Sequence, residues 1–390
     1  MLTPEQIDAL ADKCQQLVDP VVNYLIADIV RRILEAGKAT PTAKNQAQTA
    51  ASLGVVPKDV KTFLETQTKL TQKEIANVYK TAAQLTWAQS IAGKDPRVEA
   101  FAKNEALQNI VKAMTDMATD KMENITQTIG MIGPYGNPLP LRSVYTAYSD
   151  YALQNVAIGG ESYQKAMMDS VKGITKYGIQ VIDYQSGQHA NLDVAVRRNI
   201  FGGLGLMVER IEEEAHDQTG ADGWEISAHY NSAEDHEPYQ GRQYTDAEYR
   251  ALNGTPEEPG KLRRRISTLN CKHIAFPIII GVNQPQYTAE QLREMKQKNA
   301  DGITFQGRHY TGYEATQMQR ALERQIRATR RNIVAYEQDP SLFDKQLTAA
   351  RAKHKVLEDR YKAFSQAAGL RTQERRLEVI DFGPSQMTKI

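Results

Sequence analysis

The stretch SLFDKQLTAARAKHKVLEDRYKAF, residues 341–364, decides how the C-terminal part of this chain folds. Its apolar side chains recur at alternating steps of four and three residues, a heptad pattern that predicts a helix with one packing seam. We expect His354 to be a tolerated polar position in this seam. The seam consists of Phe343, Leu347, Ala350, His354, Leu357, Tyr361 and Phe364.

A second helix is predicted directly before this stretch. Apolar residues from Ala315 to Ile333 fall on one helical face, and Asp339-Pro340 ends the helix because proline cannot continue it. The two helices, within residues 313–390, are expected to pair as an antiparallel hairpin or to pack on partner proteins.

The residue pattern of 221–312 differs from that of the predicted helices. This region contains short β-like runs, turn residues and the polar loop NGTPEEPGK, residues 253–261. This pattern predicts a small α+β module.

The N-terminal half predicts helices, so the fold class is mainly α. The turn-rich stretch GPYGNPLPL, residues 133–141, predicts a boundary between two helical regions, 1–132 and 133–220. Helices are expected to begin at the capping box Thr71–Glu74, at Arg97 and at Leu192.

Composition excludes several classes of protein. The chain has 390 residues, 41% of them hydrophobic and 24% charged, which is typical of a soluble globular protein. A net charge of +1 does not indicate a dedicated nucleic-acid binder. No signal peptide or membrane span is predicted, so we expect synthesis in the cytoplasm and no membrane partner. The two cysteines, Cys14 at a core-facing helical position and Cys271, form no disulfide framework.

Candidate ligands for a metal ion lie in two stretches, WEISAHYNSAEDHEPYQGRQY (224–244) and NCKHIAFPIIIG (270–281). A thiolate and imidazoles suit zinc. The spacings match no standard zinc finger, so the sequence favours the alternative of a hydrogen-bonded cluster without a cofactor. In that alternative Gly241 makes a tight turn and His236 pins an extended segment. The candidate ligands are His229, His236, Cys271 and His273.

Catalysis by these residues is not expected. On a regular strand, Cys271 and His273 would not bring their reactive atoms together, and no HExxH, phosphate-binding loop or GxGxxG motif occurs. We therefore expect no enzyme and no small-molecule substrate. A metal-dependent hydrolase with Glu234 or Asp235 as base stays an alternative.

Two groups of basic residues could contact nucleic acid. One is the segment KLRRR, residues 261–265; the other is a stripe at i, i+4, i+7 and i+11 on one predicted helix. The stripe could equally be a solvated face or supply ion pairs, for example between Glu323 and Arg327. The stripe consists of Arg320, Arg324, Arg327 and Arg331.

Four motifs in linked order resemble the phage minor capsid protein 2 family, which is akin to the Mu-type head morphogenesis proteins of tailed phages. The resemblance covers roughly residues 177–364. Where the family often has an Ala-Arg-Pro step before the second histidine, this chain has SAED, residues 232–235. The motifs are VIDYQSGQHANLDVAVRRNI (181–200), WEISAHYNSAEDHEPYQG (224–241), NCKHIAFPIIIG (270–281) and GRHYTGYEATQMQRALERQIRATRR (307–331).

This resemblance implies a low-copy structural protein of the virion, assembled in the bacterial host cytoplasm and acting in head morphogenesis near the portal. The implied partners are the portal and other head proteins. Contact with packaged DNA, as an assembly or ejection factor using the arginine stripe, is the alternative function.

Overall fold

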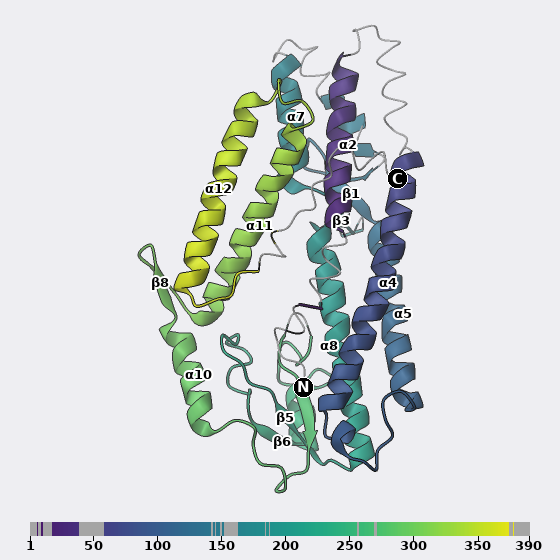
Figure 1. Cartoon of the computed structure of the whole chain (residues 1–390), viewed down its shortest axis with the longest axis vertical. Coiled ribbons are helices and arrows are strands. Elements are labelled where there is room, and N and C mark those ends of the chain that lie inside the picture. The colour runs from purple at the N-terminus through teal and green to yellow at the C-terminus, as the bar shows by residue number, and fades with distance from the viewer. Residues whose placement is uncertain are drawn as a thin grey trace.

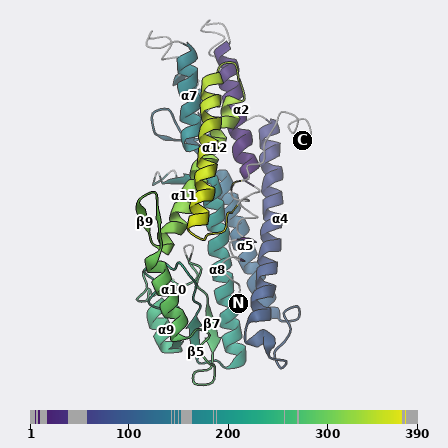
Figure 2. The ribbon, with the colours of Figure 1, turned by 60° about the vertical axis from the view of Figure 1, so that its left-hand side comes forward.

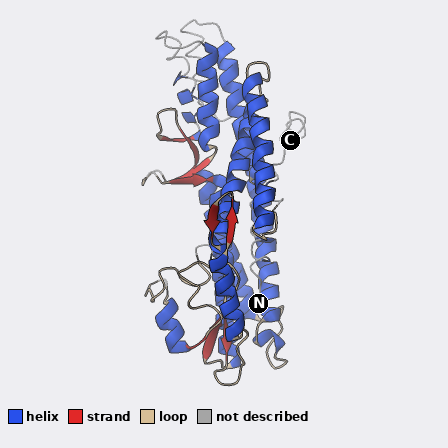
Figure 3. Ribbon diagram, turned by 90° about the vertical axis from the view of Figure 1, so that its left-hand side faces the viewer, coloured by secondary structure: helices blue, strands red, loops and turns tan. Residues whose placement is uncertain are grey.

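The computed structural model describes residues 18–38, 58–151, 163–255, 257–268 and 271–373, apart from residues 142, 145, 149, 184 and 187, together with residues 6, 9, 10 and 377. Cys14, predicted to face the core, lies outside these residues. The fold is mainly helical, as predicted, and the helices run along the long axis of an elongated molecule (Figure 1). The strands form small sheets beside the helices (Figure 3).

Long helices of the N-terminal half make two packed groups. Helices α4, α5 and α8 pack together. Helices α2 and α7 pack with the C-terminal helix α11 (Gly312–Tyr336) toward the other end of the molecule (Figure 1). One hydrophobic core runs through both groups, and its described members extend from Leu10 to Ala350. The helices are α2 (Asp19–Lys38), α4 (Lys58–Gln89), α5 (Glu105–Gln127), α7 (Tyr163–Tyr177) and α8 (Leu192–Thr219), with a short 3-10 turn η1 (Ala92–Lys94) after α4.

Two predicted helix starts are wrong. Helix α4 begins at Lys58 and runs through Thr71, whose hydroxyl donates to the Gln67 carbonyl at 2.8 Å instead of capping a new helix. Helix α5 begins after Asn104, whose side chain accepts from Leu107 N at 3.2 Å, and not at Arg97. A capping box begins a helix only where the residues before it are not helical. Here the packing of residues such as Phe63 keeps the preceding residues helical.

Residues 129–191 contain strands that the sequence did not predict. Four short strands make an antiparallel sheet in the order β2-β1-β3-β4. The stretch 133–141 forms the turn and second strand of its first hairpin, with Met131 paired to Leu139. The strands are β1 (Ile129–Ile132), β2 (Pro138–Pro140), β3 (Gln180–Ile182) and β4 (His189–Asn191).

The small α+β module lies at one end of the molecule (Figure 2). Its three-stranded antiparallel sheet has the order β6-β5-β7, and β7 packs on α8. The ring of His216 on α8 stacks on Trp224 of β5 with centroids 5.0 Å apart. The module contains β5 (Gly223–Ile226), β6 (Gln243–Thr245), α9 (Asp246–Asn253), β7 (Ala275–Ile278), α10 (Ala289–Asp301), β8 (Ile303–Phe305) and β9 (Arg308–Tyr310).

The C-terminal helices α11 (Gly312–Tyr336) and α12 (Asp344–Ala367) form the predicted hairpin (Figure 1). The apolar seam residues are all buried, and those near the end of α12 pack with Leu322 and Ile326 of α11. His354 is half-buried and accepts a hydrogen bond from Arg330 Nε at 2.9 Å. This chain therefore covers its own seam, and the alternative that the seam packs on partner proteins is wrong.

None of the helices in the described part of the chain is both long and apolar enough to cross a bilayer.

Candidate metal centre

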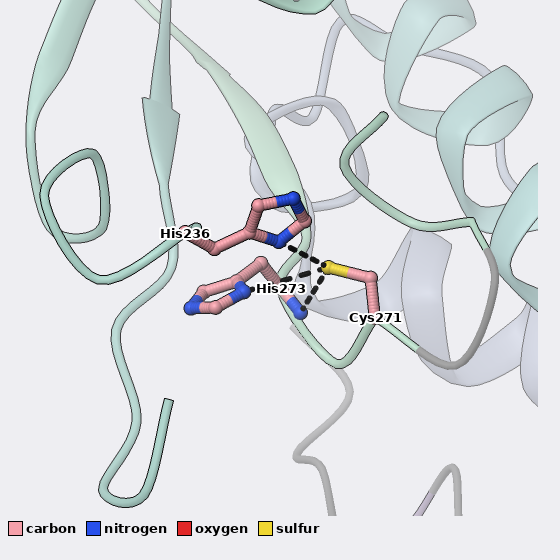
Figure 4. Close-up of side chains that lie close together, drawn as sticks. All are labelled: His236, Cys271 and His273. Carbon is pink, nitrogen blue, oxygen red and sulfur yellow. Dashed lines mark hydrogen bonds between the residues drawn. The ribbon is translucent and has the colours of Figure 1, made fainter. Parts of the chain in front are cut away.

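Three of the four predicted ligands meet in the core of the module. The His236 Nδ1 lies 3.2 Å from the Cys271 Sγ, and the His273 Nδ1 lies 3.4 Å from the same sulfur (Figure 4). One ligand atom from each of the three side chains lies within 4.8 Å of the others. All three residues are buried, at 1% exposure for His236, 6% for Cys271 and 2% for His273. We call these three residues the Cys-His-His cluster.

Both rings of this cluster are held by carbonyl oxygens on their outer side. The His236 Nε2 lies 2.8 Å from the Arg264 backbone oxygen, and the His273 Nε2 lies 3.0 Å from the Gln240 Oε1. The Gln240 Oε1 also accepts from the backbone N–H of His229 at 3.1 Å, which identifies it as the oxygen of the amide. Since an oxygen acceptor needs a donor, each Nε2 carries the proton and each Nδ1 presents its lone pair.

Electrostatics keeps the cluster uncharged. Burial raises the pKa of the Cys271 thiol to about 11. Burial lowers the pKa of His236, and burial together with the neighbouring His229 and His236 lowers the pKa of His273 well below its usual value. At neutral pH one S–H therefore faces two Nδ1 lone pairs, and it can donate fully to only one of them.

The fourth predicted ligand, His229, lies beside the cluster and not in it. Its ring stacks on the ring of His273 with centroids 4.3 Å apart, and its Nδ1 lies 2.9 Å from the Tyr230 carbonyl oxygen. Among the described residues, the group that could hold a metal ion contains only His236, Cys271 and His273.

Two predictions about the local backbone are wrong. Residues 271–274 precede β7 and are not part of a strand, so the Cys271 and His273 reactive atoms do reach each other. The segment around His236 is a series of turns and not extended, with the Gln240 N–H donating to the His236 carbonyl at 3.2 Å. The tight turn at Gly241 is confirmed by its φ of 67°, a conformation that favours glycine.

The residues that support the cluster were not identified from the sequence. Asp235, considered only as a catalytic base, binds the Arg264 guanidinium through two hydrogen bonds of 2.8 and 2.7 Å. This ion pair holds the Arg264 backbone, whose carbonyl fixes His236. The Gln240-Gly241 turn was visible in the sequence, but the partner of the Gln240 amide depends on the tertiary fold.

Only part of the arginine stripe of α11 faces solvent. Arg327 and Arg331 are each only 8% exposed, because their face of α11 packs on α2 and α7, and Arg327 reaches Asp193 of α8. Arg327 Nε pairs with Asp193 Oδ2 on α8 at 3.0 Å, so this arginine supplies an ion pair. Arg324 is exposed and Arg320 is half-buried.

A buried charge network surrounds Arg327 and Arg331. The Asp19 carboxyl at the start of α2 has its pKa raised to about 8 by burial and by the charge of Asp193, against the opposing effect of the arginines. Burial lowers the pKa of Arg331. The Arg331 side chain lies against Gly178, where a Cβ would meet its Nε at 2.8 Å. These charges join α2, α8 and α11.

The segment KLRRR also forms ion pairs. Arg264 binds Asp235, and Arg265 binds Glu209 on α8. Neither arginine is therefore a free basic group.

Comparison with known proteins identifies a family. The family model described as Phage minor capsid protein 2 matches residues 2–365. Neither the curated proteins nor the solved structures contain a significant match. The matched range includes both helical groups, the module with the Cys-His-His cluster and nearly all of the hairpin. The chain belongs to the phage minor capsid protein 2 family and is a structural protein of the phage virion.

Proposed function

We propose that this protein is a low-copy component of the phage head that is built in near the portal and acts in head morphogenesis. The observation that carries the proposal is the family match over residues 2–365, because it assigns a capsid role to almost the whole chain. The resemblance to Mu-type head morphogenesis proteins supplies the location near the portal. Assembly would take place in the host cytoplasm, with other head proteins as partners.

The internal construction of the chain supports a structural role. Its long helices bury their apolar faces against one another. A buried charge network also links α2, α8 and α11; it consists of Asp19, Asp193, Arg327 and Arg331. An elongated body with such internal links can hold a fixed length between two neighbours in a particle. This argument favours a fixed structural element over a segment that folds only on its partner.

The DNA-binding alternative depended on the arginine stripe as a phosphate-binding surface. Arg327 and Arg331 are buried, so they cannot neutralise phosphates on the surface of this fold. For the hydrolase alternative, one of the two candidate bases, Asp235, is bound to Arg264, and the other, Glu234, is exposed.

The location is tested by cross-linking mass spectrometry of intact heads. A phage that lacks this gene is complemented by the full chain, and exposed lysines such as Lys355 on α12 and Lys296 on α10 report the neighbours. We expect cross-links to the portal protein and to adjacent head proteins. Heads assembled without the chain should lack these cross-links and should package DNA poorly. Cross-links confined to shell or tail proteins away from the portal would contradict the proposal.

A further inference from the structure

The Cys-His-His cluster has more lone pairs than protons at its centre. Two Nδ1 lone pairs point toward one sulfur, and the outer Nε2 of each ring is already bound to a carbonyl oxygen. A hydrogen-bonded cluster of this kind leaves one nitrogen without a full donor. We propose that His236 Nδ1, Cys271 Sγ and His273 Nδ1 bind one divalent ion of the zinc class.

The distances fit such an ion. With Zn–S at about 2.3 Å and Zn–N at about 2.0–2.1 Å, tetrahedral geometry separates the sulfur from each nitrogen by about 3.5 Å. The two sulfur–nitrogen distances in the structure are 3.2 and 3.4 Å. All three ligand atoms lie within 4.8 Å of one another. Since two nitrogens in a tetrahedral site lie about 3.3 Å apart, side-chain shifts would be needed to admit the ion.

The surrounding hydrogen bonds match those of metal-binding histidines. Such histidines donate their other ring N–H to a carbonyl or carboxylate, which fixes the tautomer and the ring orientation. The Arg264 carbonyl does this for His236, and the Gln240 amide oxygen does it for His273. Asp235 in turn holds Arg264, so the outer residues are themselves fixed.

The donor set selects the class of metal. One thiolate and two neutral imidazoles suit Zn²⁺ or Co²⁺, whereas Mg²⁺ and Ca²⁺ prefer oxygen ligands. On binding, the ion displaces the thiol proton, which leaves to solvent as a metal–sulfur bond forms. Among the described His, Cys, Asp and Glu residues no fourth ligand atom joins the group, so a water molecule would complete a tetrahedral site.

The ion would join two segments of the module. His236 lies in the turns between β5 and β6, whereas Cys271 and His273 lie directly before β7. Strands β6 and β7 flank β5 in the sheet. The metal would therefore cross-link the segment between β5 and β6 to the segment before β7. The proposed role is structural, and it goes beyond the function proposed above.

The test uses the full chain without an affinity tag, purified without chelator. Elemental analysis should give about one zinc per chain, and exchange for Co²⁺ should give the intense visible bands and the near-ultraviolet thiolate band of a tetrahedral cobalt–sulfur site. Chelator should lower the Tm of the module and expose Cys271 to alkylation, followed on its own peptide by mass spectrometry. The wild-type cobalt spectrum does not depend on whether any variant folds.

Variants distinguish the cluster from adventitious binding. Cys271→Ser should abolish the thiolate band, and His236→Gln should lower the metal content at least tenfold. His229→Gln is the matched control, because His229 stacks on His273 but lies outside the cluster, and it should keep the metal. Absence of zinc and of a cobalt–thiolate band in the folded wild type would overturn the proposal. Equal metal content in the wild type and in Cys271→Ser would also overturn it.

Discussion

Asp193→Asn tests the buried charge network most sharply. The side chains of Asp193 and Arg327 are 7% and 10% exposed, and their charged atoms lie 3.0 Å apart. Removing one member of a buried pair costs about 3–5 kcal/mol, because the remaining charge stays buried without its partner.

Asp19 can offset part of this loss. The charge of Asp193 is one cause of the raised pKa of Asp19, so its removal should lower that pKa and favour a second carboxylate beside the arginines. At pH 7, ionising a group with a pKa of about 8 costs about 1.4 kcal/mol. We therefore expect Asp193→Asn to lower the free energy of unfolding by about 3 kcal/mol at pH 7 and by less at pH 8.5.

Urea denaturation followed by circular dichroism at 222 nm measures this loss at both pH values. The control is Glu337→Gln, since Glu337 pairs with Arg351 on the surface of the hairpin and should contribute only about 0–1 kcal/mol. A loss below about 1 kcal/mol for Asp193→Asn, equal to the control, would refute the reasoning.

Three further substitutions have defined outcomes. Asp19→Asn should flatten the pH dependence of stability: the unfolded carboxyl ionises near pH 4 and the folded one near pH 8, so the stability that the protonated Asp19 contributes is present below about pH 4 and lost as pH rises to about 8. Stability curves of equal slope for the variant and wild type would contradict the assignment. Leu357→Ala in the buried seam should cost about 2–5 kcal/mol in urea, whereas Val356→Ala on the exposed face of the same turn should cost less than about 0.5 kcal/mol; equal losses would place the seam elsewhere. Gly241→Ala should cost more than about 1 kcal/mol, because its φ is 67° and its Cβ would collide with the Leu292 side chain; an unchanged Tm would show that the turn can relax.

The sequence predicted the helical hairpin well. A heptad seam can be recognised from the spacing of apolar residues within one helix, and it requires a second helix to pack against. The prediction failed at Thr71, where a local capping signature lies inside a helix held by packing from distant residues. It also missed the sheet of β1–β4, whose strands are three or four residues long and separated in sequence. Strand pairing of this kind depends on tertiary contacts that no local period reveals.

The sequence identified the residues of the candidate site but not their arrangement in space. Cys271, His236 and His273 were recognised by residue type, but their convergence depends on the turns of residues 233–241 and on the irregular segment before β7. The arginine stripe shows the opposite case: the helical spacing was correct, but the direction of that face depends on where α2 and α7 pack. The division into 1–132, 133–220, 221–312 and 313–390 stays a prediction that limited proteolysis can test.

Counting this chain in purified, nuclease-treated virions tests the central claim most directly. Isotope-labelled peptides from α8 and α11 serve as internal standards, and peptides of the major shell protein give the number of particles. A minor capsid protein should be present in every preparation at a small number of copies per particle, far below the shell protein. Absence from infectious virions, or a copy number equal to that of the shell protein, would contradict the account.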